Sequence, residues 1–534
     1  MNKSRSIVIA LLSVTFLTIA QTMPQKIKKL LNAQYAINAL YVDSVNEDKL
    51  VEDAIKGMLN ELDPHSSYTT AKETEELDEP LQGSFSGIGI QFRMNLDTLY
   101  VIQTVAGGPS ERVGLRAGDR IVEVNDTLIA GVKMKTNDIM KRLRGPKDTK
   151  VEVKVKRGNN PELITFRITR DDIPLYSVDA AYMLDGKTGY VKIARFAAST
   201  NEEFVKAVDS LKNVGMKQLI VDLCDNGGGY LNSAIEMSNE LLNKDELIVY
   251  TEGRNSPRNE AKAIGNGKYR KGKVAVLVNQ YSASASEIFS GAVQDWDRGV
   301  IVGRRTFGKG LVQRPLRFED GSMIRLTVAR YYTPSGRCIQ KPYKKGDRLD
   351  YEMDIVNRYK GGELSSADSI HFADSLRVST LRNGRTIYGG GGIMPDVFVP
   401  IDTTEYSDYY RDLVAKGVIV QYTLDYVDKH RADIKNRFAT VADFDLGFVI
   451  DETIEKEVIA AGERDSVHFN AEQYAKSKNL IKNIVKALIA RDAYTDPAAY
   501  FVVMNHSNEM ISKALDILND DRRYNELLSV SSKK

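Results

Sequence analysis

Cysteine and histidine are both scarce in this 534-residue sequence, which has two cysteines and five histidines. Cys224 and Cys338 are too few for a disulfide scaffold or a cysteine-built zinc site, although a single disulfide and two free thiols both stay open. The histidines show no paired metal-ligand spacing, and none is identifiable as the base of a Ser-His-Asp triad. The sequence therefore implies no metal site and no cofactor.

An excess of charge of one sign is also missing. The chain has 74 Lys and Arg against 72 Asp and Glu, and its net charge is +2. A nucleic-acid-binding protein needs a basic patch or a broad excess of cations, so this balance excludes nucleic acid as an expected partner. The composition is otherwise that of a globular protein, and the length indicates three or four domains. We expect the partners to be other polypeptides.

Long hydrophobic runs are absent beyond the first 20 residues. Lys3 and Arg5 precede an apolar run over residues 7–20, which is shorter than the roughly 20 apolar residues of a spanning helix. Small residues before Gln21 suit signal-peptide cleavage, so residues 1–20 predict export to the periplasm or another extracytoplasmic space. No cysteine near residue 20 offers a lipoprotein anchor. An uncleaved segment that keeps the protein at a membrane is the alternative.

The rest of the chain divides into four regions by its hydrophobic pattern. Residues 21–83 are helical and charged, residues 84–171 alternate as β-strands do, residues 172–400 mix strands with helices, and residues 401–534 are mostly helical. The expected fold class is a multidomain α/β protein. Buried strands are expected at residues 219–223, 274–278, 300–302 and 324–329. The C-terminal helices either pack on the α/β core or mediate oligomerisation, and the pattern does not separate these roles.

A candidate nucleophile lies in S-A-S-A-S-E-I-F at residues 282–289. Apolar residues from Ile288 to Trp296 recur at helical spacing, which places Ser284 at a helix N-terminus. Backbone N–H groups there stabilise negative charge, so the N–H of Ala285 is a natural oxyanion donor. The alternative is a purely structural role, in which Ser284 and Glu287 form only a capping box.

The candidate base is Lys309 in T-F-G-K-G-L-V-Q at residues 306–313. A lysine of reference pKa about 10.4 is protonated at neutral pH, so burial beside Phe307 and Leu311 must lower its pKa before it can accept a proton. Gln313 follows at a spacing that lets it orient the amine without adding charge. Taken alone, this lysine would more commonly be a solvated surface charge.

A second oxyanion donor is expected in D-L-C-D-N-G-G-G, which ends the strand expected at residues 219–223. Three glycines after a strand usually form only a turn, but they can also bring backbone N–H groups close to a substrate carbonyl. We assign this role to Gly228.

These motifs together resemble the C-terminal processing peptidases, also called tail-specific proteases. Lys309 lies 25 residues after Ser284 and Gln313 four residues after Lys309, as in that family. The resemblance implies a crotonase-like α/β protease core, with Ser284 as nucleophile, Lys309 as general base and Gln313 as its partner. It also implies supporting roles for Glu287, Asp295 and Thr306. L-D-P-H-S-S-Y at 62–68 and G-G-I-M-P-D-V at 391–397 match further family segments, whereas Cys224 and Gly227 depart from the arginine and proline of many members.

A PDZ domain is expected over residues 84–171. G-I-G-I at 87–90 and G-L-R-A-G-D-R-I-V-E-V-N at 114–125 together resemble such a domain, although a glycine pair before a strand is more often a turn. In a PDZ domain this loop binds a terminal carboxylate through backbone N–H groups, and the adjacent strand pairs with the peptide. Ile88, Gly89 and Ile90 are the predicted carboxylate-binding residues.

The sequence therefore predicts an exported serine endopeptidase that binds polypeptide C-termini and cleaves near them. The predicted regions are a signal peptide (1–20), an N-terminal helical region (21–83), a PDZ domain (84–171), a Ser-Lys protease core (172–400) and a C-terminal helical region (401–534). One alternative is a PDZ-based peptide-binding scaffold with an inactive core. Another is a crotonase-type acyl-thioester enzyme, which would need neither the PDZ domain nor the Ser-Lys pair. The oligomeric state and activation by a partner protein stay open.

Overall fold

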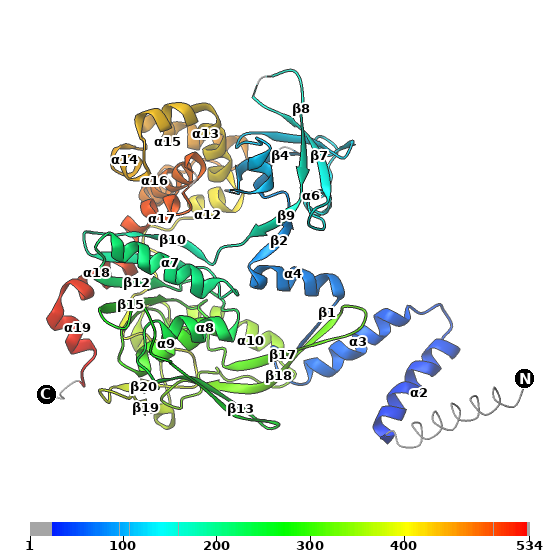
Figure 1. The fold of residues 1–534 in the computed structure, drawn as a ribbon, viewed down its shortest axis with the longest axis vertical. Helices are drawn as coiled ribbons and strands as arrows, with labels where there is room; N and C mark the ends of the chain where they lie inside the picture. Colours follow the sequence, from blue (N-terminus) through cyan, green and yellow to red (C-terminus); the bar gives the residue numbers. More distant parts are fainter. Residues whose placement is uncertain (1–23, 96, 106, 159, 495, 531–534) are drawn as a thin grey trace, which may run out of the picture.

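The computed structural model describes residues 24–530, except positions 96, 106, 159 and 495. The signal peptide expected over residues 1–20 lies outside the described residues. Figure 1 shows two projecting N-terminal helices, a large α/β body below, and a β-rich domain beside a helical bundle above. Within the described ranges, no helix has both the length and the apolar character needed to cross a membrane.

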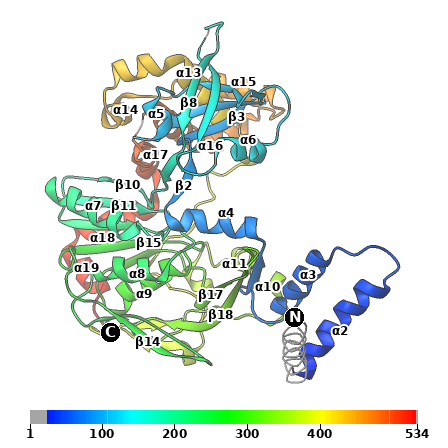
Figure 2. The same ribbon diagram turned by 45° about the vertical axis from the view of Figure 1, so that its right-hand side comes forward.

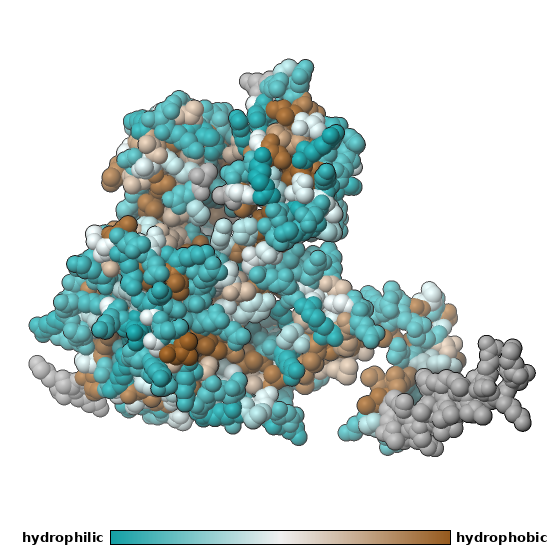
Figure 3. All heavy atoms as spheres, viewed as in Figure 1, coloured by the Kyte–Doolittle hydropathy of each residue, from teal (hydrophilic) through white to brown (hydrophobic). Residues whose placement is uncertain are grey.

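The N-terminal helices α2 (Gln25–Leu40) and α3 (Glu47–Asn60) extend away from the α/β body (Figures 1 and 2). The side chain of Asn46 caps α3 by accepting a hydrogen bond from the Lys49 N–H. Four apolar side chains of α2 are exposed by 39 to 49%, namely those of Ile27, Leu30, Leu31 and Ile37. The projecting helices therefore show apolar surface to solvent (Figure 3).

The sequence pattern missed a strand in the N-terminal region. Residues Ser67–Thr69 form β1, which pairs antiparallel with β18 (Met323–Tyr332) of the α/β body. Helix α4 (Ala71–Gln82) follows, with a capping box between Thr70 and Glu73 at its start and Gly83 in a left-handed conformation at its end. The strand β1 could not be recognised locally because its partner lies far along the chain.

The β-rich domain holds one sheet in the order β3-β4-β5-β7-β8, with β6 paired to β5. Its strands and helices are β3 (Ile90–Asn95), β4 (Thr98–Thr104), α5 (Pro109–Arg112), β5 (Arg120–Val124), β6 (Thr127–Leu128), α6 (Thr136–Leu143), β7 (Lys150–Lys156) and β8 (Ile164–Thr169). Ile121, Val153 and Ile168 are fully buried in its core together with Ile139 of α6. The strand β3 lies at one edge of the sheet.

A two-stranded ribbon connects this domain to the α/β body. Strand β2 (Ser84–Gly87) enters the domain and β9 (Asp171–Pro174) leaves it, and the two pair antiparallel. Helix α4 lies between this ribbon and the body (Figure 2).

A six-stranded sheet forms the centre of the α/β body. Its order is β10 (Val178–Met183), β11 (Thr188–Ile193), β12 (Gln218–Asp222), β15 (Lys273–Val278), β16 (Val300–Gly303) and β21 (Val397–Phe398), and all neighbours are parallel except β10 and β11. Every residue of β11 and β12 is buried, as continuous apolar strands of a covered parallel sheet require.

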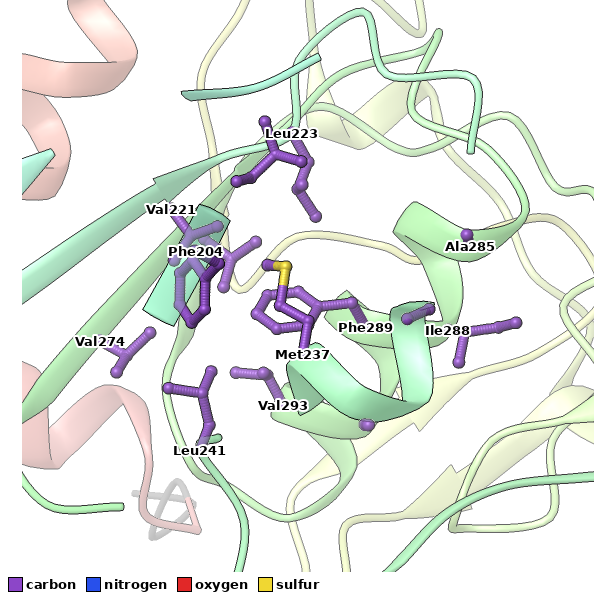
Figure 4. Packing of buried hydrophobic residues seen from close by; sticks show 14 of the residues in the cluster. Phe204, Val221, Leu223, Met237, Leu241, Val274, Ala285, Ile288, Phe289 and Val293 are labelled. Atoms are coloured by element: carbon purple, nitrogen blue, oxygen red, sulfur yellow. The ribbon is translucent and has the colours of Figure 1, made fainter. Parts of the chain in front are cut away.

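Helices cover both faces of this sheet. Helices α7 (Thr200–Asn213), α8 (Leu231–Asn239) and α9 (Ala285–Asp295) pack on one face, where Met237 lies close to Phe289 (Figure 4). Helix α18 (Glu509–Asn519) packs on the other face and α19 (Asp521–Leu527) follows it. The last helices of the chain therefore pack on the α/β core, one of the two roles that the sequence left open.

A second, antiparallel sheet flanks the catalytic side of the body. It contains β1, β18, β13 (Leu247–Gly253) and β14 (Ser256–Lys262), with β17 (Leu311–Arg317) also paired to β18. Residues 324–328 of β18 are only partly buried, so the expectation of a buried strand at 324–329 is wrong for most of its length. Of these residues, Arg325 lines a cavity.

The remaining segments complete the body and the helical bundle. Helices α10 (Arg348–Glu352) and α11 (Asp354–Lys360), two short 3-10 turns and the hairpin of β19 (Arg377–Ser379) and β20 (Thr386–Tyr388) follow β18. The bundle has its own core and contains α12 (Asp408–Ala415), α13 (Val418–Arg437), α14 (Val441–Gly447), α15 (Glu452–Arg464), α16 (Ala471–Ala493) and α17 (Ala499–Met504).

The helical bundle packs against the β-rich domain. A cavity of about 20 Å³ between them is lined by Tyr100 and Gly118 on one side and by Asp428 and Arg431 of α13 on the other. A Cβ atom on Gly118 would lie 3.3 Å from Oδ1 of Asp428. Helix α13 of the bundle therefore packs closely against the β-rich domain beside β4.

Candidate active site

Ser284 is the serine of its motif that faces open space. The hydroxyl of Ser282 donates to the carbonyl of Leu223 at 2.8 Å, that of Ser286 donates to the carbonyl of Asn226 at 2.8 Å, and both side chains are fully buried. Ser284 instead lines a cavity with a volume of about 1060 Å³. The capping box expected between Ser284 and Glu287 is present at the start of α9, so the side chain of Ser284 both caps this helix and lines the cavity.

The backbone at Ser284 is unusual. It precedes the first residue of α9 with φ of 55° and ψ of −111°, a conformation that L-residues with a side chain rarely adopt. Such strain persists only where the surroundings fix it, and it is typical of functional positions. Here the N–H of Ser284 donates to Oε2 of Glu287 at 2.8 Å, and the carbonyl of Ser284 accepts from the hydroxyl of Tyr331 at 3.1 Å.

Lys309 lies in the loop between β16 and β17 and lines the same cavity as Ser284. Burial lowers its pKa below the ordinary value, and the positive charge of Arg325 lowers the pKa further. No hydrogen bond or ion pair engages Nζ among the residues that the structure describes. The direction of the pKa shift is the one that a lysine acting as a base requires.

Glu287 holds the two candidate catalytic residues together. Its carboxylate accepts hydrogen bonds from the N–H groups of Ser284, Gly308 and Lys309 at 2.7 to 2.8 Å, and from the hydroxyl of Thr306 at 2.5 Å. Complete burial raises the pKa of Glu287 to about 7, while these hydrogen bonds lower it. Glu287 and Thr306 thus have the supporting positions that the resemblance implied.

Asp295 supports the site from further away. It lies at the end of α9, where its carboxylate accepts from Arg337 and from the Ser335 N–H, each at 2.8 Å. This pair fixes the end of the helix that begins beside Ser284.

Tyr331 is a residue that the sequence patterns did not single out. Its buried hydroxyl contacts the carbonyl of Lys309 as well as that of Ser284, so one side chain bridges both backbones. Burial raises its pKa well above the ordinary value, and the phenol stays protonated. No local signal marks this tyrosine, because its role depends on β18 lying beside the loops of both residues.

Gln313 lines the cavity, but its side chain forms hydrogen bonds with residues other than Lys309. Its Nε2 donates to the carbonyl of Leu311 and to the hydroxyl of Thr327, each at 3.2 Å. Thr327 in turn donates to Asp63 at 2.9 Å. The structure therefore brings Gln313 near Lys309, whereas its direct orientation of the amine stays a prediction.

The two predicted oxyanion donors lie side by side. A Cβ atom on Gly228 would lie 2.8 Å from Cβ of Ser284 and 2.9 Å from the nitrogen of Ala285, so only glycine fits there. The N–H of Ala285 has no partner among the described residues. The N–H of Gly228 donates to Oδ1 of Asn226 at 2.9 Å, so its role as an oxyanion donor stays a prediction and requires release from Asn226.

His65 also lines the cavity, although no sequence pattern identified a histidine as a catalytic base. Its Nε2 lies 2.8 Å from the hydroxyl of Tyr351. Burial and then the charge of Lys309 lower its pKa to about 3, so the ring is neutral at physiological pH. A histidine with that pKa is a poor proton acceptor.

The cysteines are both free. Cys224 follows β12 and is close to Met510 of α18, with a distance of 3.7 Å between the sulfur atoms. The carbonyl of Cys224 accepts a hydrogen bond from Lys192 at 2.6 Å, which contributes to holding the glycine loop.

The predicted carboxylate-binding loop lies at the start of β3. The carbonyl of Ile88 accepts from Ser110, and the carbonyl of Gly89 accepts from the Val105 N–H at 3.0 Å. No hydrogen bond among the described residues engages the N–H groups of Ile88 and Gly89. Gly89 has φ of +71°, and Ile90 begins the edge strand. The loop therefore offers free backbone donors beside an open strand edge, as carboxylate capture requires.

Comparison with known families assigns most of the chain. Residues 187–350 match peptidase family S41 and residues 86–168 match the PDZ domain. Residues 13–74 match the N-terminal domain of the activating protease CtpB, and residues 409–495 match a family of unknown function. The fold and these matches define a serine-type peptidase with a PDZ domain.

Curated relatives extend the similarity over most of the chain. The carboxy-terminal processing protease CtpA of Bacillus subtilis (strain 168) is 35% identical over 356 residues, covering 65% of this chain and 75% of the relative. A probable CtpA-like serine protease of Staphylococcus aureus (strain MRSA252) is 34% identical over 375 residues, covering 69% and 73%. The solved photosystem II D1 C-terminal processing protease is 30% identical, covers 59% of this chain and 90% of that one, and gives a TM-score of 0.33. The chain belongs to the C-terminal processing peptidases.

Proposed function

We propose that the protein is an exported Ser-Lys endopeptidase that binds a polypeptide C-terminus in its PDZ domain and cleaves near that end. One observation carries the catalytic part. Ser284 and Lys309 line one cavity, Nζ of Lys309 has no hydrogen bond or ion pair among the described residues, and Glu287 accepts hydrogen bonds from both backbones. Export is proposed from residues 1–20, whose basic start and apolar run are typical of a signal peptide.

The chemistry follows from these positions. Neutral Lys309 accepts the proton of Ser284 Oγ as the oxygen attacks the scissile carbonyl. The N–H groups of Ala285 and Gly228 stabilise the oxyanion, after Gly228 has released Asn226. The lysine ammonium then protonates the leaving amine, which gives an acyl-enzyme and a new N-terminus. A water molecule, deprotonated by Lys309, attacks the ester and regenerates Ser284.

Single and double variants test this mechanism. We expect Ser284→Ala, Lys309→Ala and the double variant to lose peptide cleavage to a similar extent, on the order of a thousandfold or more, because the base has no purpose without its nucleophile. Lys271 is exposed, so Lys271→Ala is the matched control and is expected to keep wild-type turnover. Cleavage products are identified by mass spectrometry, and circular dichroism checks folding. Near-normal turnover in either single variant would contradict the mechanism.

A further inference from the structure

The catalytic cavity contains one arginine without a partner. Three arginines line this cavity in addition to Lys309, and they are Arg317, Arg325 and Arg348. Two carboxylates also line it, those of Asp78 and Glu236. Arg317 forms an ion pair with Asp78, and Arg348 forms one with Glu352 at 2.9 Å. Arg325 has neither an ion pair nor a side-chain hydrogen bond among the described residues.

The position of Arg325 is fixed by the sheet. It lies on β18 between two paired strands, opposite Ser67 of β1 and Pro315 of β17. Residues two apart on a strand point to the same face, and Met323 also lines the cavity. The backbone of Arg325 is therefore held on a strand that is paired on both sides, and this strand presents the side chain at the cavity wall.

The charge of Arg325 acts on two residues that line the same cavity, Lys309 and Tyr230. Arg325 lowers the pKa of Lys309 more than any other charged residue does, although burial is the larger cause. It also opposes the rise in the pKa of Tyr230, which burial causes and the charge of Asp78 increases. Tyr230 directly follows the glycine loop, so the cavity that Arg325 lines also holds the proposed base and the loop of the predicted oxyanion donor.

A guanidinium that lines a cavity without a counter-ion is ready to bind an anion. Its planar N–H groups match a carboxylate in bidentate geometry, and the resulting hydrogen bonds are stronger than those between neutral groups. Polypeptide substrates carry this group as an acidic side chain or as the chain terminus. We propose that Arg325 binds a substrate carboxylate beside the scissile bond and so selects where the polypeptide is cut. This inference rests on the proposed peptidase function and assigns its substrate preference.

Matched peptides and variants test the proposal on the full-length protein. Mass spectrometry first locates the scissile bond in a parent peptide. Peptides with Glu, Gln or Lys at each flanking position test the side-chain source, and free or amidated termini close to the cut test the terminal source. Each peptide is assayed with the wild type, Arg325→Gln, Arg325→Lys and Arg330→Gln. Arg330 is an exposed arginine on the same strand and does not line the cavity, so it is the control.

We expect the wild type and Arg330→Gln to favour Glu over Gln, or a free over an amidated terminus, by roughly tenfold or more in kcat/KM, since charged hydrogen bonds contribute about 1.5–3 kcal/mol. Arg325→Gln should lose this preference mainly through KM, and Arg325→Lys should retain part of it. Persistence of the preference in Arg325→Gln, or no carboxylate preference in the wild type, would overturn the inference.

Binding measurements separate this inference from the proposed function. Ser284→Ala retains the cavity, so the affinity of each peptide is also measured in that background with Arg325 present or replaced by Gln. A carboxylate preference that depends on Arg325 would support the inference even if the wild type cleaved none of the peptides, an outcome that would count against the peptidase function alone. Equal affinities for all the peptides would refute the inference while cleavage by the wild type still supported the function.

Discussion

Oε2 of Glu287 accepts a hydrogen bond from the N–H of Lys309 at 2.8 Å, although the two residues are 22 positions apart. The same oxygen accepts from the N–H of Ser284. One buried carboxylate therefore connects the loop that carries the proposed base with the start of the helix that carries the proposed nucleophile. Loss of any of the hydrogen bonds that this carboxylate accepts should destabilise the site, because each buried N–H left unpaired costs about 1–3 kcal/mol.

Replacing Glu287 with Gln should reduce activity by roughly 10 to 100 times, since the amide places an NH₂ group against N–H donors. Loss of the negative charge should also lower the pKa of Lys309, because Glu287 raises that pKa in the native protein. The acid limb of the residual activity should thus move to lower pH. Rate profiles of kcat/KM against pH measure both effects, with exposed Glu319→Gln as the control. Wild-type activity in the Gln variant would show that the hydrogen bonds accepted by the Glu287 carboxylate are dispensable.

The kcat/KM of the wild type should rise with pH as Lys309 loses its proton. The pKa of Lys309 is lowered, so the neutral amine becomes available below the pH at which an ordinary lysine titrates. The charged or titratable groups that act on it are Arg325, Glu287, Asp63 and His65. His65 has a pKa of about 3 and is already neutral, so His65→Gln should keep the acid limb. Disappearance of that limb in the variant would transfer the role of base to His65.

The sequence singled out the proposed catalytic pair, and the family resemblance indicated Glu287 and Thr306 as supporting residues, but other residues around the pair were missed. Ser284 and Lys309 lie in short motifs whose glycines and helix start are visible locally. Tyr331 and Arg325 carry no such signal, because their roles depend on how β18 lies beside β17 and the catalytic loops. Contacts of this range, such as that between Thr327 and Asp63 at a separation of 264 residues, are set by the fold.

Local patterns were also least informative at sheet boundaries. The apolar residues of β12 predicted a buried strand, and the parallel sheet buries all of them. A similar apolar pattern in β18 gave the same expectation, but that strand belongs to an antiparallel sheet with one face on the cavity. The pattern does not state which sheet a strand joins. The glycine loop illustrates a finer limit, because no spacing indicates that Asn226 binds the Gly228 N–H.

Asp428 of α13 should help to hold the helical bundle on the PDZ domain. Burial raises the pKa of this carboxyl, whereas the charges of Arg431 and Arg120 lower it. Asp428→Arg would place a third cation in the contact, so strands β4 and β5 should exchange backbone hydrogens faster. Asp433→Arg makes the same change at an exposed position of the helix and should leave exchange unchanged. Equal protection of β4 and β5 in both variants, measured by hydrogen–deuterium exchange, would exclude this role for Asp428.

The PDZ loop should distinguish a free C-terminus from an amidated one. The free N–H groups of Ile88 and Gly89 need a negative carboxylate, so amidation should lower kcat/KM by roughly tenfold or more while the scissile bond is unchanged. Gly89→Val should remove the distinction, because Gly89 has φ of +71° and its Cβ would lie 2.9 Å from Ile173. Gly131→Val tests the same change at φ of +73° with nothing within 4 Å, and it should keep the distinction. Peptides whose cut site lies far from the tail separate this loop from the carboxylate site at Arg325. Equal cleavage of free and amidated tails by the wild type would refute tail recognition and leave a peptidase without preference for chain ends.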